Sequence, residues 1–141
     1  MFMFDTKDMS WWYWLASSAC LWVTLSIHPD AYQWALLLGL VQLVHYRFIE
    51  GSIKRFPVQI RLAYVIYLLF AMPENLQWIL WLPAIGSVAR VVFGYCLLAR
   101  LLALLPLNRE VPLSWQYVLN TFFTRPVRGN ILQGLPALKA A

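Results

Sequence analysis

The 141-residue chain is 62% hydrophobic and only 12% charged, with a formal net charge of +5 and a mean hydropathy of +0.63. A soluble domain carries about 25% charged residues and could not bury this much apolar surface at such a length, so the composition excludes a soluble globular protein. The basic residues stand beside apolar stretches, where they orient membrane spans. The positive charge therefore does not indicate binding to nucleic acid.

A first membrane span is predicted at residues 11–27. It opens with the aromatic run WWYW, and such clusters are typical of the interface between bilayer and water. Ser10 stands where an N-cap is expected, and Pro29 ends the helix because a proline disfavours helical backbone in the residue before it. The chain is expected to turn back at this proline.

A second span is predicted at residues 31–48, with Asp30 as its N-cap. One side of this helix carries a glycine and three polar or aromatic side chains at helical spacing: Gly39, Gln42, His45 and Tyr46. This side is expected to face protein rather than lipid. His45 and Gln42 are the candidate cofactor-binding residues, for a haem or a quinone. The alternative is that His45 only pairs with Gln42, Tyr46 or a neighbouring carbonyl.

The most basic loop covers residues 47–61 and holds four basic side chains against the single acid Glu50. A short third span is predicted at residues 57–72. It is ended by the PEN turn at residues 73–75, because such a polar sequence does not sit in lipid. Residues 76–82, with two tryptophans, are expected to form an interfacial half-helix that leads into the fourth span.

The fourth span lies within residues 76–109, which are almost wholly apolar but contain Arg90 and Arg100. A straight helix crosses the hydrocarbon core with about 20 residues, so this longer stretch must bend or lie partly on the surface. Pro83 together with Gly86 marks the expected kink or re-entrant entry.

The two arginines are expected to have different functions. An arginine at the bilayer centre costs about 2.5–3.5 kcal/mol, and on a straight helix the two would lie ~15 Å apart. Arg100 is nearer the basic side and is expected to snorkel to headgroup phosphates. Arg90 has no carboxylate at matching depth in the chain, so we expect it to make a buried bidentate contact to an acid or phosphate of another molecule.

The C-terminal part, residues 111–141, is expected to form a separate region after the transmembrane domain at residues 1–110. An amphipathic helix is predicted at residues 111–124, with Pro112 in its first turn and apolar residues at helical spacing: Trp115, Val118, Leu119 and Phe122. Arg125 and Arg128 follow. A helix of this kind beside basic residues lies on an anionic membrane surface or docks on a partner, and the remaining tail is expected to be disordered or extended along a neighbour.

The charge pattern predicts the orientation of the spans. The turns at residues 29–30 and 73–75 contain no lysine or arginine, whereas the other connections and both ends of the chain are basic. By the positive-inside rule both termini are cytoplasmic. The sequence thus predicts an all-α, polytopic protein of the cell inner (plasma) membrane, with four transmembrane helices and a cytoplasmic amphipathic helix.

Catalytic and metal-binding patterns are missing from the sequence. The six acidic residues lie at or outside the predicted interfaces, and no paired carboxylates, metal-ligand spacing or phosphate-cradling glycine loop occurs. His28 and His45 would lie ~21 Å apart along the membrane normal, so they cannot ligate one haem from both sides. The pattern favours a non-catalytic protein.

The function predicted from these features is that of a small accessory or assembly subunit of an inner-membrane protein complex. A redox or energy-transducing complex, such as one of electron transport, is preferred because of the aromatic content and His45. The expected partners are other integral membrane subunits and phospholipid, and the chain is not expected to act as a monomer. The alternatives are a haem- or quinone-binding redox subunit and a small anion transporter or channel that acts as an oligomer.

Overall fold

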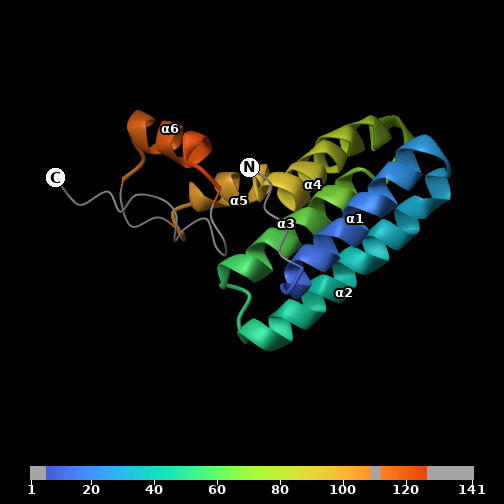
Figure 1. Cartoon of the computed structure of the whole chain (residues 1–141), viewed down its shortest axis with the longest axis horizontal. Coiled ribbons are helices and arrows are strands. Elements are labelled where there is room, and N and C mark those ends of the chain that lie inside the picture. Colours follow the sequence, from blue (N-terminus) through green and yellow to red (C-terminus); the bar gives the residue numbers. More distant parts are fainter. Residues whose placement is uncertain (1–5, 109–111, 127–141) are drawn as a thin grey trace.

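The computed structural model describes residues 6–108 and 112–126, and within these residues every regular element is helical. Four α-helices run alternately up and down as a bundle (Figure 1): α1 (Met9–Ser26), α2 (Tyr32–Glu50), α3 (Phe56–Phe70) and α4 (Trp81–Phe93). Two 3-10 helices and two short α-helices complete the described chain: η1 (Pro29–Ala31), η2 (Glu74–Leu80), α5 (Leu97–Ala103) and α6 (Trp115–Phe123). The predicted all-α class is confirmed.

The helix caps differ from the predicted ones. The N-cap of α1 is Asp8, whose carboxylate accepts a hydrogen bond of 2.9 Å from the backbone N–H of Ser10. The hydroxyl of Ser10 is instead used by Arg61. Asp30 does not cap α2, because it lies inside η1 and no side chain caps α2. The bounds of the first three helices nevertheless agree with the predicted spans within about two residues.

The bundle core is built mainly from aromatic and small side chains. Its buried members include Trp11, Trp14, Leu21, Ala35, Tyr64, Leu68 and Ala84. Small residues let the helices approach closely, and Gly39 shows this directly: a Cβ at this position would lie 3.2 Å from Cγ2 of Val65 on α3. Gly39 and Gln42 are both buried, so the prediction that this side of α2 faces protein is confirmed.

The break in the fourth apolar stretch lies at Gly94 and not at Pro83 and Gly86, where the kink was expected. Gly94 adopts a left-handed conformation with φ of 73°, and its N–H donates to the carbonyl of Arg90. A glycine in this conformation is a standard helix terminator. Pro83 is tolerated because it lies in the first turn of α4.

One continuous helical stretch, Glu74–Phe93 through η2 and α4, is long and apolar enough to cross a membrane by length and composition, and Phe56–Phe70 is apolar but shorter. The other helices of the described chain do not meet this measure. Four membrane crossings therefore stay a prediction.

Basic residues gather at one end of the bundle. This basic end is where α2 and α4 finish and where α1 and α3 begin (Figure 1). Arg47 and Arg90 lie in the last turns of α2 and α4, and Arg61 lies near the start of α3. The opposite end, at η1 and η2, carries acids only, Asp30 and Glu74. The alternation of basic and non-basic connections along the sequence thus becomes a separation of charge along the bundle axis.

Candidate functional site

Arg61 is held in place by three helices at the basic end. Its side chain is only 3% exposed, and its guanidinium donates from Nη1 to the carbonyl of Pro57 and from Nη2 to the hydroxyl of Ser10, at 2.9 and 2.8 Å. The same group lies over the ring of Tyr46, 3.3 Å from its centroid. The Nε donor is buried and has no hydrogen-bond partner among the residues that the structure describes. The guanidinium is therefore fixed in orientation but not fully satisfied.

Arg90 lies on α4 at the same end of the bundle. Because Gly94 ends the helix four residues later, Arg90 occupies the last turn, where a cation interacts favourably with the helix dipole. It is partly buried, and its side chain makes no hydrogen bond or ion pair with any other residue that the structure describes. The expectation that Arg90 lies deep in the bilayer assumed one long helix through this segment. Because the helix ends at Gly94, that assumption does not hold.

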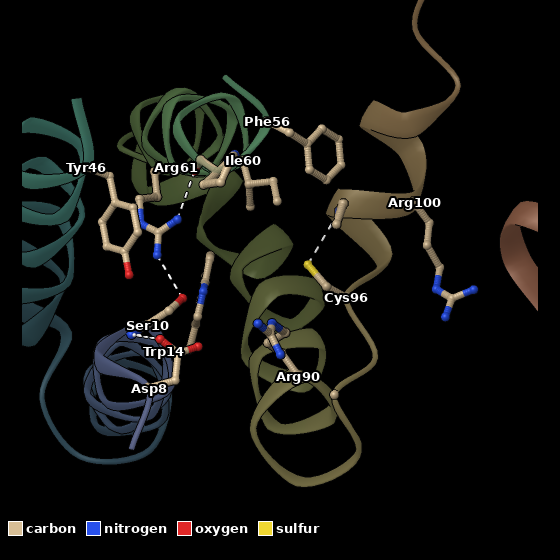
Figure 2. Close-up of a pocket in the computed structure, with 13 residues that line it drawn as sticks. Asp8, Ser10, Trp14, Tyr46, Phe56, Ile60, Arg61, Arg90, Cys96 and Arg100 are labelled. Atoms are coloured by element: carbon tan, nitrogen blue, oxygen red, sulfur yellow. Dashed lines mark hydrogen bonds between the residues drawn. The ribbon is translucent and has the colours of Figure 1, made fainter. Parts of the chain in front are cut away.

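Arg61 and Arg90 line the same cavity, which has a volume of about 210 Å³. Figure 2 shows the two side chains entering from α3 and α4, with Trp14 of α1 between them in this view. Asp8 is the one carboxylate in the lining, and it serves as the N-cap of α1. Among the residues described, no carboxylate forms an ion pair with either arginine. The described lining therefore carries an excess of positive charge, with three arginines against the carboxylate of Asp8.

The chemistry available in this cavity is anion binding. Two guanidinium groups present planar arrays of N–H donors that match the oxygens of a phosphate or carboxylate. No protein-family model, curated protein or solved structure matches the chain. No group of three or more histidine, cysteine or acidic residues that could hold a metal ion occurs in the described part of the chain.

Arg100 does not extend to headgroups as the sequence suggested. Its side chain is 1% exposed and donates from Nη1 to the carbonyl of Thr121 in α6. Figure 2 shows its guanidinium directed away from Arg61 and Arg90. The reason lies in the break before α5, which redirects the helix axis, so the straight-helix separation of the two arginines does not apply. Arg100 contributes to the cavity lining, but its guanidinium donates its hydrogen bonds to backbone carbonyls of α6.

The candidate cofactor residues His45 and Gln42 both join α2 to α1. Nδ1 of His45 lies 2.7 Å from the hydroxyl of Tyr13, and Nε2 of Gln42 donates to the hydroxyl of Ser17 over 2.9 Å. His45 is thus paired within the chain, but its hydrogen-bond partner is Tyr13 and not Gln42, Tyr46 or a carbonyl as the alternative expected. A haem or quinone at these residues stays a prediction.

The C-terminal helix begins later than predicted. Ser114 is the N-cap and accepts a hydrogen bond from the N–H of Tyr117, so Pro112 lies before the helix. α6 buries Tyr117 and Thr121 against the chain and leaves Trp115 76% exposed. Phe122 is half-buried. The exposed side of α6 is therefore available for contact with lipid or a partner, and that contact stays a prediction.

Arg125 is exposed just beyond α6. Arg128 and the predicted tail lie outside the described residues.

Sequence reasoning missed Arg61 as a site residue: it counted Arg61 in the basic loop at residues 47–61, although the predicted third span at residues 57–72 also contains it. A signal was present in the sequence: Pro57 fits the first turn of a helix, and apolar residues continue on both sides of Arg61. Those features place Arg61 inside the third helix. What the sequence could not show is that Arg61 and Arg90, on different helices, line one cavity.

Proposed function

We propose that the chain is a small, non-catalytic subunit of a membrane complex and that its Arg61–Arg90 cavity binds an anionic group of another molecule. One observation carries this proposal: the cavity brings together two arginines that form no ion pair with Asp8, the carboxylate in its described lining. An uncompensated buried charge is costly. The counter-charge is therefore expected from outside the chain.

The outer surface of the bundle supports a membrane location. Along α2 an apolar row repeats at intervals of three and four residues, and each side chain in it is about half exposed or more: Trp34, Leu37, Val41, Val44 and Phe48. A continuous exposed apolar surface of this kind marks contact with lipid or protein. The apolar row extends over most of α2. It is therefore suited to contact with the bilayer or with the helices of another subunit.

The charge separation along the bundle supports the orientation. The basic end would face the cytoplasm by the positive-inside rule, with the turns at η1 and η2 on the outer side. In the proposed arrangement both termini are cytoplasmic and the membrane is the inner (plasma) membrane. The preference for a redox or energy-transducing complex rests on the aromatic content and on His45.

Affinity purification of the full chain tests the proposal. The chain carries an N-terminal tag, membranes are solubilised in digitonin, and the co-purifying proteins are identified and quantified by mass spectrometry. We expect a fixed set of integral membrane proteins in stoichiometric amounts. Arg90→Gln should lower their recovery about tenfold, as expected for the loss of one charged hydrogen-bonded contact.

Arg47→Gln is the matched control, because it removes the same charge from an exposed arginine at the same end of the bundle. It should leave recovery unchanged. A wild-type chain that purifies without other membrane proteins would show that it is not a subunit. Equal recovery with the two variants would show that the cavity takes no part in assembly.

A further inference from the structure

A second cavity, of about 330 Å³, adjoins the cationic one and is almost entirely apolar. It follows α4 from Arg90 back to Leu82, and Tyr64 and Tyr67 of α3 line its other wall. This groove exists because α4 packs mainly on α1 and α3 packs mainly on α2, so that α3 and α4 make few contacts with each other. Leu97, Leu98 and Leu101 of α5 line the groove as well.

The two cavities meet at Arg90. Trp14, Arg90 and Cys96 line both of them, and Figure 2 shows the Arg90 side chain between Trp14 and Cys96. From Arg90 to Leu82 the groove covers eight residues, or ~12 Å along the helix axis. The polar cavity lies at the basic end, and the groove leads from it toward the middle of the bundle.

We infer that the two adjoining cavities together bind one anionic phospholipid, with its phosphate at Arg61 and Arg90 and an acyl chain in the groove between α3 and α4. The inference rests on the proposed function, in which the cationic cavity takes an anion from outside the chain, and it names that anion. A phosphate with charged oxygens complements the two guanidiniums. An acyl chain complements the apolar walls.

The direction of the site agrees with this occupant. In the proposed orientation the basic end lies at the cytoplasmic leaflet, where anionic lipid phosphates are found. The groove runs along the bundle axis, which is also the direction of lipid acyl chains. A soluble anion would leave the apolar groove empty, and a zwitterionic lipid would bring a cation close to the two arginines together with its phosphate.

The groove can be blocked without disturbing the helix packing. Gly86 lines it, and a Cβ added there would meet no atom within 4 Å. Gly86→Leu therefore places a side chain in the open groove. Val88→Leu is the matched control, because Val88 lies on the same helix, is 37% exposed and lines neither cavity.

The experiment measures lipid binding to the purified full chain by native mass spectrometry in dodecyl maltoside. The probes are dioleoyl phosphatidylglycerol, dioleoyl phosphatidylcholine and inorganic phosphate. We expect the wild type to bind phosphatidylglycerol about tenfold more tightly than phosphatidylcholine, because the choline cation of the latter is repelled by the two guanidiniums that hold the phosphate. Arg90→Gln should remove that preference, whereas Arg47→Gln should keep it. Gly86→Leu should weaken phosphatidylglycerol binding about tenfold, and Val88→Leu should not.

Several outcomes would overturn the inference. If inorganic phosphate competes as well as the lipid does, or if Gly86→Leu and Val88→Leu bind lipid equally, the groove holds no acyl chain. If Arg90→Gln loses partner proteins but keeps phosphatidylglycerol binding, the anion is a partner's carboxylate and the proposed function stands without the lipid. If phosphatidylglycerol binds as expected but no protein co-purifies with the wild type, the subunit proposal fails and the lipid site stands.

Discussion

Arg100 of α5 donates a hydrogen bond of 2.6 Å from Nη1 to the carbonyl oxygen of Thr121 in the last turn of α6. A second bond of 3.2 Å goes from the same nitrogen to the carbonyl of Phe122, and the guanidinium lies over the ring of Tyr95. The last carbonyls of a helix lack intrahelical donors and carry partial negative charge. A buried arginine at this position therefore caps α6 and attaches it to α5.

Arg100→Gln should release α6 from the rest of the chain. Hydrogen bonds from a charged group contribute about 1.5–3 kcal/mol, so amide hydrogen exchange in residues 115–123 should become at least about tenfold faster. The measurement is exchange followed by mass spectrometry on the detergent-solubilised chain. Arg125→Gln is the control, because Arg125 is exposed just beyond the same helix. Unchanged exchange with Arg100→Gln would show that the other contacts of α6, among them the hydrogen bond from the Tyr95 hydroxyl to the carbonyl of Phe122, are sufficient to hold it.

Gly86 lies within α4 and Gly94 is its C-cap. Replacing them by alanine should change the stability of the chain in opposite directions. Gly94 has φ of 73°, so Gly94→Ala should destabilise the chain by about 1–2 kcal/mol through left-handed strain. Gly86 lies inside the helix with open space at its Cβ position, so Gly86→Ala should stabilise it by about 0.5–1 kcal/mol. Thermal unfolding in detergent measures both. If Gly94→Ala left the thermal stability unchanged, the assignment of the helix break to Gly94 would be wrong.

The Gln42–Ser17 hydrogen bond should behave as a coupled pair. Both side chains are fully buried, so Ser17→Ala leaves the Gln42 amide without its acceptor and should cost about 1–3 kcal/mol. Adding Gln42→Leu removes the unpaired amide, and the double variant should recover most of this loss. Denaturant unfolding of the two single variants and the double variant gives the coupling. Strictly additive effects would show that the bond contributes nothing to the α1–α2 contact.

Cysteine labelling checks the proposed orientation. In a Cys20→Ala, Cys96→Ser background, Lys54→Cys marks the basic end and Asn75→Cys marks the opposite end. The serine at position 96 retains an acceptor for the cap of α5. An impermeant maleimide added to intact cells should react at position 75 and not at position 54. Labelling at position 54 and not at position 75 would show that the chain has the opposite orientation in the membrane.

Helix positions were largely predictable, because they follow from short-range patterns. Proline and apolar runs delimit α1, α2 and α3 in the sequence, and the structure places their ends within about two residues. The fourth stretch was assigned wrongly at its break. Pro83 was given more weight than Gly94, although a glycine after an arginine in the last turn is the stronger signal for a helix end.

The candidate site was only half predictable. Arg90 could be identified from one segment, because a charged residue in an apolar segment is energetically costly and so indicates a specific contact. Arg61 acquires its role from tertiary packing: Ser10, Tyr46 and Pro57, which come from three separate helices, position its guanidinium. Single-sequence patterns carry no information on which faces of distant helices meet. The contact of Arg100 with α6 was inaccessible for the same reason, since it depends on the redirected axis of α5.

The helix break at Gly94 also divides the apolar interior of the chain into two parts of very different size. The large core lies among α1–α4, whereas α5 rests on a small one formed by Phe56, Ala99 and Ala103. A segment with few buried apolar contacts opens at lower free energy than the body it is attached to. Unfolding is therefore expected to be non-cooperative, with a probe on α6 reporting an earlier transition than a probe at Gly39. A single melting temperature would then describe neither part of the chain.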